Sequence, residues 1–245
     1  MKKFKALIPA FLMLLLSAAL LGTSTFAWFS MNNRVEVNNL QITADTNSTY
    51  LLISKTQTTA SGIQSEGSIS VAETVTSANA KVYPSAYEIT DASDFATVGN
   101  WYTGNSNDPA NYQLVNATKT ALTTFDHYVI HNTYYITVAA GSAPATDLIV
   151  SAYDIASNGT ATGSDTTFES IKTVVVCGSN YEEFDSTDTA GSVTLYTSNI
   201  TDSTVVTVDV YIYMDGNNTT VYTNNFENLD GAAIGLTFSV TPAAV

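Results

Sequence analysis

Short runs of alternating or β-branched apolar residues, separated by turn-forming residues, recur along the chain after residue 30. Runs such as TVVTVDVYIYM give way to stretches rich in Gly, Asn, Asp, Ser and Thr. Those residues form turns because they tolerate positive φ or hydrogen-bond their own backbone, and an alternation of period two is typical of strands. The pattern predicts about ten strands, at residues 34–44, 49–55, 82–89, 127–140, 147–155, 171–177, 192–198, 203–214, 220–224 and 233–240.

Strands at this spacing, without helices between them, predict an all-β fold: an antiparallel two-sheet sandwich that is jelly-roll-like. The 14 Tyr and 10 Phe residues agree with a strand-rich core. The best hairpin signal is Asp215-Gly216, between two alternating runs. Residues 56–79 and 91–111 are predicted to be long loops with short pieces of structure. No linker divides residues 28–245, so we expect a single secreted domain there.

Residues 1–27 have the layout of a signal peptide, a helix that is removed on export. MKKFK is basic, residues 6–21 are apolar, and Thr25-Phe26-Ala27 places small residues where signal peptidase cuts. We expect cleavage between Ala27 and Trp28. The alternative is a retained membrane anchor, because residues 6–29 are long enough to span a bilayer, which takes about 20 residues. The end of the chain, FSVTPAAV, has no sortase motif or apolar tail, so no membrane contact is expected after cleavage.

Charge and cysteine content restrict the partners of the exported chain. Three of the eight basic residues lie in the leader, so its removal leaves five against 22 acidic residues. Nucleic acids and anionic lipids are bound by Lys and Arg that neutralise phosphates, and a nucleic-acid partner is therefore not expected. The single cysteine, Cys177, cannot form an internal disulfide. It lies in the apolar run KTVVVCG, and we interpret it as a buried strand residue.

The residue types that carry catalysis do not form a recognisable constellation in the sequence. His127 and His131 on one strand would lie about 13 Å apart, too far to share a metal. Two acidic runs, YEEFDSTD and ENLD, contain neighbouring carboxylates: Glu182, Glu183, Asp185 and Asp188, then Glu227 and Asp230. Such carboxylates could bind calcium or hydrolyse glycosides, but neither run has an EF-hand pattern. We therefore expect acidic surface loops, no enzyme activity and no cofactor, with calcium binding as the alternative.

The residues around the cleavage point carry a family resemblance. The leader ends in GTSTFA, Trp28-Phe29-Ser30 follows at once, and NNLQITA comes next in the first predicted strand. This arrangement resembles the camelysin and TasA family of Gram-positive secreted proteins, whose precursors are cut by a dedicated signal peptidase of the SipW type. The resemblance covers residues 20–44. It implies a biofilm-matrix or surface-fibre subunit with a jelly-roll fold, in which the N-terminal strand of one subunit can complete the sheet of its neighbour.

Two functions follow from the sequence, and the first is a structural one. A secreted sandwich in the extracellular or cell-surface matrix would self-associate into a homopolymer, because an extended N-terminal strand can pair with an open sheet edge. The alternative is that this N-terminal strand is simply the first strand of its own domain. Val35 and Val37 are expected to supply one face of the strand, and Leu40 and Ile42 the other face after a shift at Asn38-Asn39. The candidate assembly residues are Phe29, Met31, Val35, Val37, Leu40 and Ile42.

The second function is that of a soluble adhesive or carbohydrate-binding module. The loop WYTGNSNDPANY holds three aromatic residues, Trp101, Tyr102 and Tyr112, among polar ones. If exposed, such rings could stack on sugars. This alternative therefore requires that the three aromatics lie on the surface.

Overall fold

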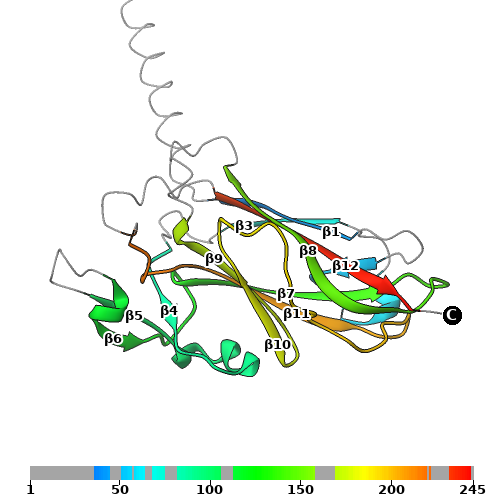
Figure 1. Ribbon diagram of the computed structural model, residues 1–245, viewed down its shortest axis with the longest axis horizontal. Coiled ribbons are helices and arrows are strands. Elements are labelled where there is room, and N and C mark those ends of the chain that lie inside the picture. Colours follow the sequence, from blue (N-terminus) through cyan, green and yellow to red (C-terminus); the bar gives the residue numbers. More distant parts are fainter. Residues whose placement is uncertain are drawn as a thin grey trace, which may run out of the picture.

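The chain folds into β-strands joined by turns and short 3-10 helices (Figure 1). The computed structural model describes residues 36–44, 51–56, 58–63, 68–74, 82–105, 113–157, 169–219, 221 and 232–243. Among these residues all strand pairs are antiparallel except that of β1 with β12. The prediction of a mostly β fold with antiparallel sheets is confirmed. The predicted signal helix, residues 1–27, lies outside the described residues.

A four-stranded sheet joins the two ends of the described chain. Its order is β3 (Ser68–Thr74), β1 (Glu36–Ala44), β12 (Ala232–Pro242) and β8 (Ala145–Ser157). β1 runs parallel to β12 and antiparallel to β3, and β8 runs antiparallel to β12. β1 is therefore an internal strand with a neighbour on each side.

A five-stranded sheet lies against the first one. Its order is β10 (Asn180–Phe184), β9 (Ile171–Cys177), β11 (Val206–Met214), β7 (Val129–Val138) and β2 (Leu51–Ser54). β11 is central, with β9 on one side and β7 on the other. Its β-branched and aromatic residues suit a strand that is buried on both faces.

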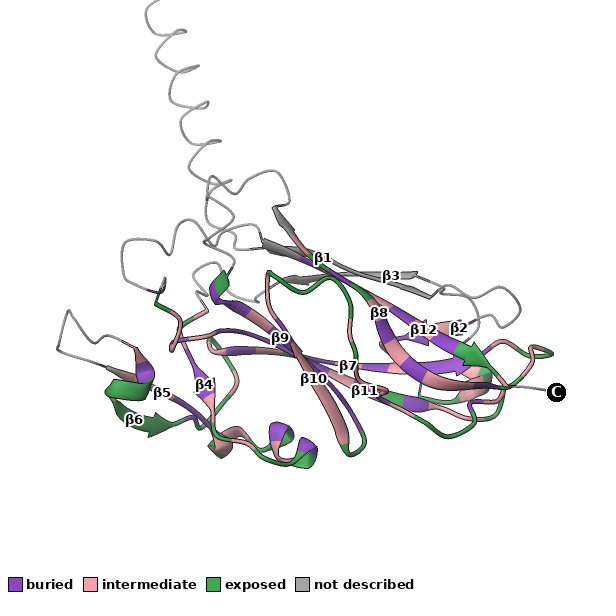
Figure 2. Cartoon of the chain, viewed as in Figure 1, coloured by how far each residue is buried: buried purple, intermediate pink, exposed green. Residues whose placement is uncertain are grey.

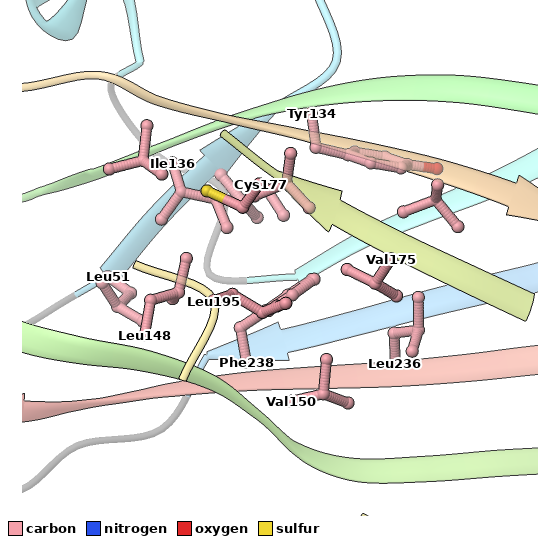
Figure 3. Close-up of a cluster of buried hydrophobic side chains, with 14 of the residues drawn as sticks. Leu51, Tyr134, Ile136, Leu148, Val150, Val175, Cys177, Leu195, Leu236 and Phe238 are labelled. Carbon is pink, nitrogen blue, oxygen red and sulfur yellow. The ribbon is translucent and has the colours of Figure 1, made fainter. Parts of the chain in front are cut away.

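One hydrophobic cluster lies between these two sheets (Figure 3). Val208 enters it from β11, and Leu236 and Phe238 enter it from β12. Side chains alternate between the faces of a strand, so Tyr211 and Tyr213 leave β11 on the opposite face and join a second cluster. Burying one large apolar side chain stabilises the fold by about 1.5–3 kcal/mol. The five-stranded sheet thus has a buried layer on each face.

Residues 82–105 and 113–128 form what we call the covering segment, which supplies the second cluster. It contains β4 (Ala86–Tyr87), η2 (Ala92–Ala96), η3 (Val98–Asn100), β5 (Trp101–Asn105), η4 (Leu114–Asn116) and β6 (Thr118–Ala121). β4, β5 and β6 make a small sheet of their own. In Figure 2 the segment lies on the side of the five-stranded sheet away from β1 and β8. A further short 3-10 helix, η1 (Ala60–Gly62), follows β2.

Several strand predictions need correction. The run at 192–198 forms an isolated bridge rather than a strand. The hairpin predicted at Asp215-Gly216 is wrong because both sides of β11 are already occupied, by β7 and β9. The predicted loops do carry short pieces of structure, namely η1 and β3 in the loop at 56–79, and η2, η3 and β5 in the one at 91–111. β6 and β10 were not expected at all.

Candidate functional site

The candidate assembly strand lies in the middle of the four-stranded sheet. Val37, Leu40 and Ile42 belong to β1. On the β12 side, residues 41–44 pair in register with residues 235–238. The other predicted assembly residues, Phe29, Met31 and Val35, lie outside the described residues, as do the cleavage residues Ala27 and Trp28. Within one chain, β1 thus completes its own sheet.

A β-bulge interrupts the pairing of β1 with β3. Val37 pairs with Glu73, but Leu40 pairs with Val71, so three steps along β1 match two along β3. An extra residue of this kind reverses the side on which the following residues emerge. Plain alternation would put Val37 and Leu40 on opposite sides, but with the bulge they come opposite Glu73 and Val71, two residues apart on one side of β3. The register shift lies at Asn38-Asn39, but the change of face predicted there is wrong.

The outer edge of β8 is sealed by a segment comprising residues 189–200. Gly191 N–H donates to the Val150 carbonyl at 2.8 Å, and Leu195 N–H donates to the Leu148 carbonyl at 2.8 Å. Further along, Ile200 N–H donates to the Ala145 carbonyl at 2.7 Å. These bonds satisfy backbone groups that an open edge strand would offer to another chain.

The same segment also reaches β10, at the edge of the other sheet. Glu182 Oε1 accepts from the Ser192 N–H at 2.6 Å and from the Val193 N–H at 3.2 Å. Asn180 Nδ2 donates to the Leu195 carbonyl at 3.1 Å. Segment 189–200 therefore closes this side of the two-sheet body. On the opposite side, β2 pairs only with β7, and β3 only with β1, within the described part of the chain.

The predicted sugar-contact loop is not a surface feature. Trp101 is 0% exposed and Tyr102 is 8% exposed. The indole Nε1 donates to the Phe95 carbonyl at 3.0 Å, and the ring meets Tyr87 and Tyr213 edge-on with centroids 5.2 Å apart. The covering segment folds these rings onto the sheet because that burial removes large aromatic areas from water. The exposure expected of Trp101 and Tyr102 is wrong, and Tyr112 lies outside the described residues.

The two histidines do not share a strand. His127 precedes β7 and has φ 67°, in the left-handed region, whereas His131 lies in β7. His131 Nε2 is 2.9 Å from Asp209 Oδ1, which also accepts from the Thr133 hydroxyl at 2.6 Å. Burial raises the pKa of Asp209, but hydrogen bonds from His131 and Thr133 and the histidine charge lower it by more. The contacts of Asp209 with His131 and Thr133 join β7 to β11.

Cys177 lies in the cluster between the sheets, as the sequence predicts. Burial, and secondarily the charge of Asp209, raise the pKa of its thiol to about 11. Nucleophilic cysteines need the opposite, a lowered pKa and access to solvent. The thiol therefore behaves as a small apolar group.

The acidic run YEEFDSTD divides between a strand and a turn. Glu182 and Glu183 lie in β10, so the expectation of a surface loop is wrong for them. Asp185 and Asp188 follow in a turn, where Asp185 Oδ1 accepts from the Thr187 N–H at 2.8 Å. Glu227 and Asp230 of the second acidic run lie outside the described residues.

The sequence does not predict a polar cluster around Lys172, which we call the Lys172 cluster: Tyr87, Lys172, Glu183, Tyr213 and Asp215. Lys172 Nζ donates to Glu183 Oε1 at 2.6 Å and lies 3.9 Å from Asp215 Oδ2. Glu183 Oε2 accepts from the Tyr87 hydroxyl at 2.5 Å and from the Tyr213 hydroxyl at 2.9 Å. One signal was available: a lysine in the otherwise apolar strand IKTVVVC needs an acidic partner, because unpaired buried charge is costly.

The described residues contain no candidate metal-binding group and no candidate membrane-spanning helix. Within the described ranges, no group of three or more His, Cys, Asp or Glu side chains could hold a metal ion. None of the described helices is long and apolar enough to cross a membrane. A scan against protein-family models, a search of curated proteins and a search of solved structures found no match to this chain. Its function has to be argued from its own strands and side chains.

Proposed function

We propose that this protein is a secreted structural subunit of an extracellular matrix or surface filament, which self-associates through β1. The observation that carries the proposal is the internal position of this N-terminal strand, between β3 and β12. The backbone groups that line this position can pair with any extended strand in the right register. β1 of a neighbouring copy can therefore take the place of the chain's own β1, which is the exchange known as domain swapping.

The finer fold in this proposal is a jelly-roll-like sandwich. Its support is the hydrophobic cluster shared by the four-stranded and five-stranded sheets and the closure of one side by segment 189–200. A sandwich of this kind keeps its shape when one strand is replaced by an identical one, because the new strand restores the same hydrogen bonds. Subunits can then join without a new interface.

Export supplies the free strand in this scheme. Removal of residues 1–27 by a signal peptidase of the SipW type releases a chain that begins at Trp28, as in the camelysin and TasA family that the leader resembles. Residues 28–35 then precede β1. The protein acts outside the cell without enzymatic chemistry or a cofactor, and calcium binding by its acidic residues is the alternative to test by chelation.

Electron microscopy of the secreted protein tests the assembly. Negative-stain images of the mature chain should show filaments, and these should persist when residues 28–35 alone are deleted. Deletion of residues 28–44, which removes β1, should abolish them. Filaments formed by the 28–44 deletion, or an intact chain that stays monomeric at every salt concentration, would overturn the proposal.

A further inference from the structure

The Lys172 cluster brings one amine and two carboxyl groups together on the outer face of the five-stranded sheet. Lys172 and Tyr213 are register partners on β9 and β11. Asp215 follows Tyr213 by two residues and therefore emerges on the same face. Glu183 reaches this face from β10, where its register partner is Val174. The side chains of Lys172, Glu183 and Asp215 are only 22%, 28% and 15% exposed.

The contacts of Glu183 and Asp215 suit the two carboxyl groups to different roles. Glu183 is fixed by three donors, namely Lys172 and the hydroxyls of Tyr87 and Tyr213. Asp215 Oδ1 accepts from the Asn217 N–H at 2.9 Å, which turns Oδ2 toward the amine, 3.9 Å away. Glu183, which three donors hold in place, is positioned to carry a proton. The carboxyl carbon of Asp215 is positioned for attack by the Lys172 amine.

Electrostatics agree with these roles. Burial raises the pKa of Asp215, and this outweighs the hydrogen bond from Asn217 and the charge of Lys172, which lower it. Burial lowers the pKa of Lys172, but the hydrogen bond and charge of Glu183 raise it by more. Lys172 is thus held beside Glu183, and the neutral form of the Asp215 carboxyl group is easier to reach than it is in water. Neutral carboxyl groups are the ones that amines can convert to amides.

We propose that Lys172 and Asp215 form an intramolecular isopeptide bond, with Glu183 as the proton carrier. The Lys172 ammonium passes a proton to the Glu183 carboxylate, and the neutral Nζ attacks Cγ of Asp215. The new bond is Nζ–Cγ, and the broken bond is Cγ–Oδ2. The departing hydroxyl takes the second proton of Nζ, relayed through Glu183, and leaves as water. The amide keeps the third hydrogen, and Glu183 ends protonated, so atoms and charge balance without a further reactant.

Proximity makes the condensation favourable inside the fold. Groups oriented in one molecule react as if their concentration were about 10⁵–10⁸ M, once the reacting atoms lie about 3–3.5 Å apart. Nζ lies 3.9 Å from Oδ2, the oxygen bonded to the carbon that it attacks. The rings of Tyr87 and Trp101, whose centroids are 5.2 Å apart, pack against the Tyr213 ring and help to hold the cluster in place. The bond would tie β9 to the end of β11 in a chain with one cysteine, whether or not that chain assembles.

Mass spectrometry of the full, denatured chain tests the bond. Relative to its sequence, the folded protein should have lost the mass of one water. Lys172→Arg and Glu183→Gln should keep the full mass, while Asp215→Asn should lose ammonia in place of water and give the same product. Lys119→Arg is the matched control, because Lys119 pairs with Glu88 on the surface of the covering segment, and it should leave the water loss unchanged.

Trypsin gives an independent readout. Lys172 is the last basic residue of the chain, so cleavage there separates residues 173–245 from those before them. An amide at Nζ blocks this cut, and residues 120–245 should stay together as one fragment with an internal cross-link. Circular dichroism checks that each variant is folded. A folded wild-type chain with its full mass, from which trypsin releases residues 173–245, would overturn the proposal and leave an ion pair only.

Discussion

Replacing Trp101 by alanine removes the ring that anchors the covering segment to the five-stranded sheet. The side chain is fully buried, and large-to-small changes at such aromatic positions cost about 3–5 kcal/mol. The change also leaves the Phe95 carbonyl without the indole donor, and a buried polar group without its partner adds about 1–3 kcal/mol. We therefore expect Trp101→Ala to lower the free energy of unfolding by at least about 4 kcal/mol.

Urea unfolding followed by far-ultraviolet circular dichroism measures this loss. Tyr83→Ala is the matched control, because Tyr83 belongs to the same segment but is 46% exposed. Surface changes of this kind usually stay within about 0.5 kcal/mol. A loss below about 1 kcal/mol for Trp101→Ala would contradict the burial argument, and it would revive the loop as a surface for sugars.

Three further predictions concern other parts of the fold. Phe238→Ala should cost about 3–5 kcal/mol in urea unfolding, since Phe238 is buried between the sheets, and a loss no larger than that of exposed Thr241→Ala would refute this. Cys177, with a pKa of about 11, should resist a thiol reagent at about pH 8 until the chain unfolds; rapid native labelling would contradict its burial. The lowered pKa of Asp209 stabilises the fold above the carboxyl's unfolded pKa, about 3.9, and this contribution is lost as the pH falls through the lower folded value. Asp209→Asn should therefore lose most stability near neutral pH and little near pH 2, and an equal loss at both would argue against a stabilising role for the contacts of the Asp209 carboxylate.

Strands with a clear apolar alternation could be predicted from sequence, while those stabilised by tertiary contacts could not. β11 and β12 follow the period of two and lie where the pattern places them. β10, NYEEF, contains two glutamates, which strands usually disfavour. It forms because Glu182 caps backbone N–H groups of segment 189–200 and Glu183 binds Lys172. Those partners lie 10 and 11 residues away in other segments, beyond the reach of a pattern of period two.

Contacts with other segments also explain why the exposure of Trp101 and Tyr102 was predicted wrongly. Trp101 and Tyr102 occur among polar residues, which suggested a surface loop, but the residues that bury Trp101 come from β11 and η2. The place of the shift at Asn38-Asn39 could be predicted from local alternation, whereas its effect on the two faces of β1 depends on the pairing with β3. Which strands flank β1 could not, because β12 lies at the other end of the described chain.

Disulfide trapping between β1 and β12 tests the central claim, strand exchange, most directly. Thr43 and Thr237 are register partners, and neighbouring strands lie about 4.8 Å apart, within the range that a disulfide spans. Two single variants, Thr43→Cys and Thr237→Cys, each in a Cys177→Ala background, would be mixed, assembled and oxidised. Strand exchange predicts covalent heterodimers on a non-reducing gel. A double variant, Thr43→Cys with Thr237→Cys in one chain, is the control for geometry. A disulfide inside single chains of the double variant, without heterodimers from the mixed single variants, would contradict strand exchange.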